Sequence, residues 1–273
     1  MFLVNCLLNL PLLIYHQQHL KEGRYRRLVG ARDIEVALLI GVVPDDEAEE
    51  LRSYEDDGEN IPDFYIPESL ENAIIDFILS GAARRYRGES NFHHSMLIHT
   101  KHTISNQSPI ARKVETLVEY WNNHLLNEFS DKGVSLKDRF RKRWNDHFLT
   151  HPSTEETWDQ IQPELMNFIH DGYNVMEINS STEHNLDYDS HEMTGLKVIA
   201  IGGNRLSRGL TLEGLCSTFF IRESRMYDTL TQMGRWFGFR PGYEDLVRLH
   251  VTPTLVEWFT WLVGVERELR ADI

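Results

Sequence analysis

The stretch LKVIAIGGNRLSRGLTLEGL, residues 196–215, joins an apolar run to a glycine pair and then to a polar loop with Arg205 and Arg208. The apolar run predicts a buried β-strand. Glycines let backbone N–H groups approach an anion closely, and a neighbouring arginine supplies charge-assisted hydrogen bonds. The loop therefore suits phosphate binding, although a plain exit from a strand has the same pattern.

Similar apolar runs recur along the chain. The other predicted strands are residues 94–100, 172–180, 217–222 and 246–252. Helical patterns lie between them, at about 67–87 and 109–170. Buried strands that alternate with helices are typical of an α/β fold with a mostly parallel sheet. Ligands bind outside the carboxyl ends of such strands, so we expect function in the loops after Thr100, Gly203 and Arg222.

Capping signals predict where two of the helices begin. Ser69 suits the N-cap of the first helix, which should end near a cluster of arginines at 84–87. Ser153 stands three residues before Glu156, the spacing of a capping box. The polar residues before Pro109 predict a turn rather than a helix.

Length and composition allow a folded domain with an ordinary core. The chain has 273 residues, of which 41% are hydrophobic, so one large domain or two small ones are expected. A formal net charge of −14 disfavours a protein that coats nucleic acid non-specifically, although a local basic groove is compatible with it. Cys6 and Cys216 lie far apart, which gives no sign of a disulfide framework or zinc knuckle and fits a cytoplasmic location.

Two segments precede the first predicted helix. Residues 1–15 are apolar but lack the positive start and cleavage site of a signal peptide, so we expect a core strand or helix, or the start of a truncated gene. Residues 44–63 are rich in acids and contain two prolines, which predicts a solvated connector or a short exposed helix that divides the chain. No stretch reaches transmembrane length, so no membrane partner is expected.

Residues 226–240, MYDTLTQMGRWFGFR, predict an amphipathic helix. Its apolar positions recur at helical spacing, at Met226, Leu230, Met233 and Phe237. Gln232 and Arg235 fall on a different, polar face. Gly234 costs this helix about 1 kcal/mol relative to alanine, which indicates close packing there. Arg240 precedes Pro241 and is pushed off the helix, so two guanidiniums leave one helix end. A surface helix with solvated arginines is the alternative.

Four of these segments together resemble a known family. They are IPESLENAIIDFILSGAARRYRG (66–88), NFHHSMLIHT (91–100), SRGLTLEGL (207–215) and QMGRWFGFR (232–240). The last two look like the fifth and sixth motifs of superfamily 2 helicases and DNA translocases, and specifically like the Z1 domain, a family to which an endonuclease function is ascribed. The resemblance covers about residues 60–255.

The resemblance implies a fold and a division of the chain. The fold would be a RecA-like mostly parallel sheet flanked by helices, with a helical insertion at about 109–170. Residues 67–273 would form the C-terminal lobe of a helicase or translocase. Residues 1–66 would be an N-terminal segment with the acidic connector, either a remnant of a first lobe or a link to it.

The resemblance also implies roles for individual residues. Arg208 and Gly209 would belong to the loop that couples ATP to nucleic acid, and Gln232 would face the nucleotide. Arg235 or Arg240 would be the arginine finger, which stabilises the charge that develops on the transferred γ-phosphoryl group. The residues implied in nucleic-acid binding are Thr100, Lys101, His102, Asn204 and Ser207. DNA would be a partner, and the parent enzyme would act in a bacterial restriction or defence system.

Two departures from the family pattern concern single positions. The sixth motif usually has its second arginine three residues after the first, where this chain has Gly238, so either arginine could be the finger. The fifth motif usually ends in aspartate, where this chain has Thr211.

A third departure is the lack of the GxxxxGK[ST] loop that cradles phosphates, because no Gly-Lys dipeptide occurs. ATP and Mg²⁺ would therefore be bound mainly by a first RecA-like lobe or the rest of a full-length parent chain. We do not expect this chain to hydrolyse ATP alone.

Other functions remain as alternatives. A Mg²⁺-dependent endonuclease could use the loop at 184–192, whose candidate ligands are His184, Asp187, Asp189, His191 and Glu192, but a solvated loop is expected and no metal site is assigned. The histidines at 93, 94, 99 and 102 could likewise serve a nuclease, but core or loop positions are favoured. Trp121, Trp144 and Trp158 could stack on bases, but helix packing is favoured. A noncatalytic module that docks on DNA or protein is the third possibility.

Overall fold

The computed structural model describes most of the chain between residues 39 and 261. The described ranges are 39–55, 65–89, 91–101, 103–127, 131–178, 186–202, 212–223, 242–259 and residue 261. The strands are β1 (Ile40–Val42), β2 (His94–His99), β3 (Asn174–Ile178), β4 (Lys197–Gly202), β5 (Leu215–Phe220) and β6 (Arg248–Val251). The helices are α4 (Asp45–Ser53), α5 (Glu68–Tyr86), α6 (Ile104–Leu125), α7 (Asp131–Arg143) and α8 (Trp158–Asp171), with a π-helical turn at Trp144–Phe148 and 3₁₀ turns at Asp189–His191 and Glu244–Leu246.

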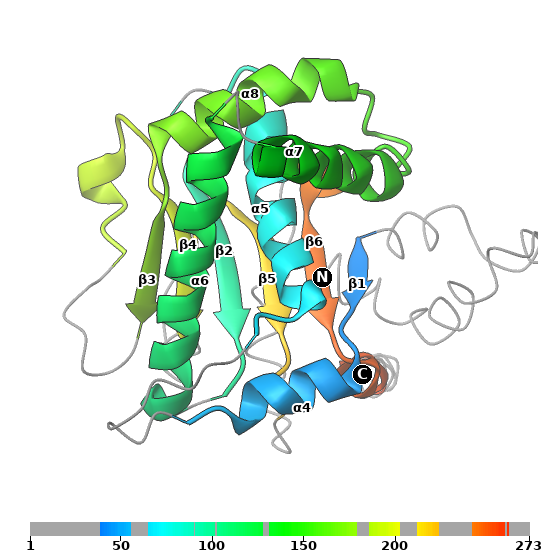
Figure 1. Cartoon of the computed structure of the whole chain (residues 1–273), viewed down its shortest axis with the longest axis vertical. Helices are drawn as coiled ribbons and strands as arrows, with labels where there is room; N and C mark the ends of the chain where they lie inside the picture. The colour runs from blue at the N-terminus through cyan, green and yellow to red at the C-terminus, as the bar shows by residue number, and fades with distance from the viewer. Residues whose placement is uncertain are drawn as a thin grey trace, which may run out of the picture.

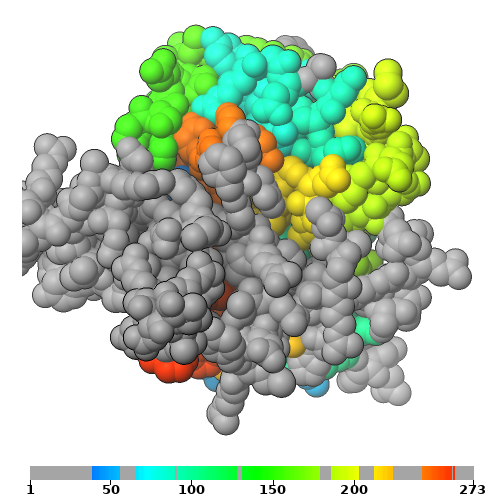
Figure 2. Space-filling model, turned by 180° about the vertical axis from the view of Figure 1, so that it is seen from behind, coloured from blue at the N-terminus to red at the C-terminus, as the bar shows by residue number. Residues whose placement is uncertain are grey.

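The six strands form one sheet in which every pairing is parallel. Their order is β1-β6-β5-β2-β4-β3, and Figure 1 shows all of them running in the same direction. Seen from behind in Figure 2, the segments that lead into β2, β4, β5 and β6 gather at one end of the molecule, the amino edge of the sheet. The predicted α/β fold with a RecA-like parallel sheet is confirmed, and β1 is a strand that the prediction did not include.

The strands are apolar because both of their faces are buried. In β2, Met96 and Ile98 pack in the core under the helices, while Leu97 belongs to a second cluster on the opposite face. The helices α5 to α8 lie over the first face (Figure 1). Strands of a parallel sheet covered on both sides carry continuous apolar runs instead of alternating ones, which is why short runs marked them in the sequence.

Close packing between α5 and α8 requires a glycine at position 81. A Cβ atom there would lie 2.3 Å from the ring of Phe168, which is fully buried. Gly81→Ala is therefore expected to lower the free energy of unfolding by about 1–3 kcal/mol through overpacking, even though alanine favours a helix by up to about 1 kcal/mol. Urea unfolding measures this change, and adding Phe168→Leu should recover part of the loss. Unchanged stability of Gly81→Ala would contradict the packing argument.

The helix starts differ from the predicted ones for tertiary reasons. Pro67, not Ser69, is the N-cap of α5, since the backbone N–H of Ser69 donates to Glu47 of α4 at 3.1 Å. The capping box of α8 is formed by Thr157 and Gln160. Ser153 and Glu156 do not form it, because the Glu156 carboxylate binds Arg87.

The helical insertion begins earlier than predicted. The predicted turn before Pro109 is wrong from Ile104 on, because α6 begins there and Pro109 lies inside the helix. The three tryptophans of the insertion are buried, which confirms helix packing: Trp121, Trp144 and Trp158.

The acidic connector is partly a helix that joins the core. Residues 45–53 form α4, and its Ala48 and Leu51 are fully buried. Residues 39–55 thus add β1 and α4 to the layers formed by the rest of the chain, with β1 paired to β6. Residues 1–38, including the apolar start, and residues 56–64 lie outside the described ranges. No described helix is long and apolar enough to cross a bilayer.

Candidate functional site at the carboxyl edge of the sheet

Three neighbouring strands end side by side at the carboxyl edge. Strand β2 lies between β4 and β5, with Ile98 opposite Ile201 and His99 opposite Phe220. Neighbouring strands are about 4.8 Å apart, so the ends of β4 and β5 are roughly 10 Å apart. Strands β2, β4 and β5 therefore end close together, and the chain leaves each of them from the same edge of the sheet.

Helix α4 holds one side of this edge (Figure 1). Arg52 donates to the Ile221 carbonyl at 3.1 Å and pairs with Glu223 at 2.7 Å. The Asn106 amide donates to the carbonyls of Leu51 and Tyr54 at 2.9 and 2.6 Å. The segment predicted as a connector thus fixes the backbone at the ends of β2 and β5.

Only two of the predicted site residues lie within the described ranges. Thr100 is buried and its hydroxyl donates to Asn106 Oδ1 at 2.7 Å. Lys101 is partly exposed and forms an ion pair with Glu55. The remaining predicted residues lie outside the described ranges, and their roles stay predictions: His102, Asn204, Ser207, Arg208, Gly209, Gln232, Arg235 and Arg240.

Arg222 is an edge residue to which the sequence assigned no role. It follows β5, is half-buried, and its Nη1 lies 3.1 Å from Nε2 of His99. Burial lowers the pKa of Arg222 below its ordinary value. No carboxylate in the described part of the chain pairs with it. The residue carries no motif, and the only signal that pointed to it is its position directly after an apolar strand.

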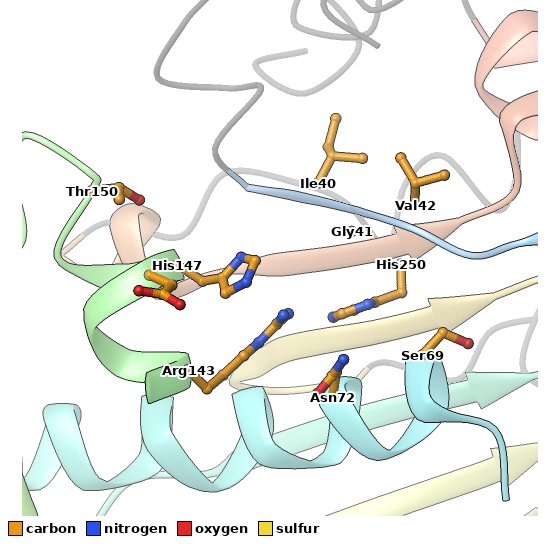
Figure 3. A pocket seen from close by; sticks show the side chains of 10 residues that line it. Ile40, Gly41, Val42, Ser69, Asn72, Arg143, His147, Thr150 and His250 are labelled. Carbon is orange, nitrogen blue, oxygen red and sulfur yellow. The ribbon is translucent and has the colours of Figure 1, made fainter. Parts of the chain in front are cut away.

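A separate pocket of about 340 Å³ lies beside the edge strand β1 (Figure 3). It is half-open and is lined by β1, β6, the start of α5 and the turn that follows α7. Its lining residues are Ile40, Gly41, Val42, Ser69, Asn72, Arg143, Asp146, His147, Thr150 and His250. Sequence reasoning missed this pocket, because its walls come from four segments that only the fold brings together.

A buried ionic cluster forms the floor of the pocket. Asp76 is fully buried and accepts two hydrogen bonds of 2.7 Å from Arg143 and one of 2.9 Å from Nε2 of His250. In Figure 3 the side chains of Arg143 and His250 approach one another. Burial alone would raise the pKa of Asp76, but Arg143 and His250 together hold it well below its ordinary value. Gly41 is required beside them, since a Cβ there would lie 2.4 Å from Nδ1 of His250.

The cluster is a structural element rather than an acid–base site. Arg248 is buried, donates to the His147 carbonyl at 2.7 Å, and lies 3.9 Å from the ring centroid of Phe148. Burial lowers the pKa of Arg248 to about 10, so it stays charged at neutral pH. Asp76 and Arg143 neutralise each other, and burial keeps His250 uncharged by lowering its pKa. The charges of Asp76 and Arg143 thus compensate each other within the fold, while the Arg248 guanidinium is held by backbone carbonyls and the Phe148 ring.

Comparison with known proteins gives a match to a family of domains. The model of the Z1 domain family matches residues 69–273, most of the chain. The chain belongs to the Z1 domain family. No curated protein and no solved structure matches it. The match begins inside α5, so β1 adds an edge strand to the sheet of this Z1 domain, and α4 adds a helix, from outside the matched residues.

The described part of the Z1 domain holds no cluster of three or more metal-ligating side chains. In the loop predicted as an alternative metal site, residues 186–192 are described, and His191 Nδ1 lies 2.8 Å from the Asp187 carbonyl on the surface. His94 and His99 are buried in the sheet, as predicted for core histidines, and His94 stacks on Phe77. His102 lies outside the described ranges.

Buried histidines predict that the Z1 domain loses stability in mild acid. Burial lowers the pKa of His94, His147 and His250, that of His147 to about 4. Below about pH 6.5 the unfolded chain binds protons that the folded chain does not, so stability is complete above pH 7 and falls as the pH drops from 6.5 towards 4. Urea unfolding between pH 5 and 8 measures this slope, and His147→Gln should reduce it. A flat profile across that range would contradict the prediction.

Proposed function

We propose that this Z1 domain is the second RecA-like lobe of a superfamily 2 type DNA helicase or translocase. The observation that carries the proposal is the strand order β4-β2-β5. In this order, the three strands after which the motifs are predicted end side by side at one edge of the sheet. In open α/β sheets, ligands bind outside the carboxyl ends of the strands. The parent enzyme would couple ATP hydrolysis to movement on DNA in a bacterial restriction or defence system, as the family resemblance implies.

The residues available indicate which part of the ATP site this chain would supply and which part a first lobe would supply. In the described part of the chain the edge carries Arg222, which has no carboxylate partner there, and Lys101, which pairs with Glu55, and such cations fit the phosphates of ATP or DNA. We propose that a first lobe with a GxxxxGK[ST] loop holds ATP and Mg²⁺. This chain would add Gln232, an arginine finger from Arg235 or Arg240, and part of the DNA track.

Reconstitution with a first lobe tests the proposal. The purified chain is mixed with a separately purified RecA-like lobe that carries GxxxxGK[ST], and ATP hydrolysis is followed with and without DNA. We expect DNA-stimulated hydrolysis in the mixture and none with the chain alone. Failure of several such lobes to give any stimulation, while each binds ATP, would count against the proposal.

The endonuclease alternative is tested on the same preparation. The chain alone is incubated with plasmid DNA and Mg²⁺, and we expect no cleavage. Cleavage that is lost on changing Asp187 and Asp189 to asparagine, but is retained in Arg235→Ala, would replace the lobe proposal by a nuclease.

A further inference from the structure

Arg222 differs from the other buried or half-buried arginines in what surrounds it. Arg84 pairs with Glu89, Arg87 with Glu156 and Asp245, and Arg143 with Asp76. Arg248 instead donates to the backbone carbonyls of Asp245, Val247 and His147. Within the described ranges, Arg222 has the His99 imidazole as its hydrogen-bond partner and no carboxylate. Arg248 also lacks a carboxylate, but three backbone carbonyls accept hydrogen bonds from it, whereas the described ranges give Arg222 one imidazole contact.

This arrangement leaves N–H groups of the half-buried Arg222 without an acceptor in the described part of the chain. Removing a guanidinium from water without an opposite charge is unfavourable, and the fold usually supplies a partner. Glu223, the residue that follows Arg222 in the chain, carries a carboxylate. The Glu223 carboxylate forms its ion pair with Arg52, at 2.7 Å, and not with Arg222. The ligand of Arg222 is thus expected to be an anion from outside the described part of the fold.

The surroundings of Arg222 favour a phosphate group as that anion. One Nη of the guanidinium is used by His99, and the remaining N–H groups of the fork match the oxygens of a phosphate. The 22-residue helix α6 begins at the end of β2, the neighbouring strand, and has no acidic residue in its first turn. Its N-terminal dipole therefore adds to the positive potential of this edge.

We propose that Arg222, oriented by His99, binds a phosphate group of the ligand at the carboxyl edge. The inference deepens the proposed function and rests on it for the nature of the ligand. The phosphate belongs either to a nucleotide or to the backbone of DNA. The two sources are separated by experiment, because only DNA binding falls with salt in proportion to the number of phosphates neutralised.

Binding by the chain itself provides the test. Fluorescence anisotropy is measured with labelled single-stranded DNA, labelled duplex DNA and a fluorescent ATP analogue, each over a range of salt. We expect Arg222→Gln to weaken one of these ligands by at least about tenfold, and Arg222→Lys to retain part of the affinity. If the source is DNA, the slope of log K against log salt should also fall by about one. Arg141→Gln on the exposed face of α7 makes the same charge change and should leave all affinities unaltered.

A second measurement uses the unmodified chain, in case Arg222→Gln does not fold. Phenylglyoxal modifies accessible arginines, and mass spectrometry reports modification of Arg222 with and without DNA, the ATP analogue or pyrophosphate. We expect one of these to protect Arg222 and to leave Arg141 reactive.

The outcomes separate this inference from the proposed function. If the chain binds DNA or the ATP analogue, while Arg222→Gln binds equally well or Arg222 stays unprotected, the inference is overturned and the proposed function stands. If pyrophosphate alone protects Arg222 and neither DNA nor the ATP analogue binds, the inference stands, and the reconstitution with a first lobe decides the proposed function. If nothing binds and nothing protects Arg222, the inference is overturned, and the same reconstitution decides the proposed function.

Discussion

Asp76→Ala is expected to destabilise the domain by about 3–5 kcal/mol, since it removes the acidic partner of a buried ion pair. Asp76 is fully buried, and its carboxylate is the acceptor for both Arg143 and His250. Without it, the Arg143 guanidinium, whose side chain is 12% exposed, keeps its charge in a poorly solvated place. The measurement is the free energy of unfolding from urea titration at pH 7.5.

Two controls separate the lost pair from a general effect of mutation. Asp138→Ala breaks the exposed pair with Arg141 and should change stability by less than about 0.5 kcal/mol. The double variant Asp76→Leu/Arg143→Met removes both charges and should be more stable than Asp76→Ala, because no unpaired charge is left. A loss below about 1 kcal/mol for Asp76→Ala would show that the pocket floor is more hydrated than its burial indicates.

Loss of the finger arginine is expected to lower DNA-stimulated ATP hydrolysis by about 10³-fold in the reconstituted two-lobe enzyme. This prediction rests on the proposed function and applies to Arg235→Ala or Arg240→Ala. A finger stabilises charge that develops in the transition state, so kcat should fall while the affinity for ATP changes little. Steady-state kinetics and separate binding measurements distinguish the two effects.

Comparing the two variants identifies the finger. We expect one arginine to account for the large loss in kcat and the other to have a smaller effect, with Arg141→Ala as a control for loss of surface charge. Wild-type kcat in both variants would remove the arginine finger from the proposal. A rise in KM with unchanged kcat would instead assign these arginines to binding of the ground state.

Local pattern predicted most of the elements correctly. Strands β2 to β6 were marked by apolar runs, and α5 ends beside the arginine cluster, as predicted. Strand β1 was not predicted, because three residues, including Gly41, carry little signal of their own. Its pairing partner, β6, lies about two hundred residues away in the chain. The helix starts were wrong where a side chain from a distant segment took the place of a local cap, as Glu47 does at Ser69.

The candidate site, like the fold, was predicted only in part from local sequence pattern. Glycines and arginines after apolar strands indicated which loops to consider, since the carboxyl ends of parallel strands are binding edges. Arg222, Arg52 and the pocket beside β1 were not predicted as functional features. Their environments depend on contacts such as Arg52 with Glu223 and Arg143 with Asp76, between residues distant in the sequence.

The sequence by itself determined that this chain alternates buried strands with helices and carries polar loops after the strands, because burial and turn chemistry act on neighbouring residues. Only the tertiary structure decided that β4 and β5 flank β2, that α4 holds the carboxyl edge, and that Asp76 meets Arg143 and His250. Strand order and buried ion pairs join residues far apart in the chain. They are set by how helices and strands pack together, which local pattern does not encode.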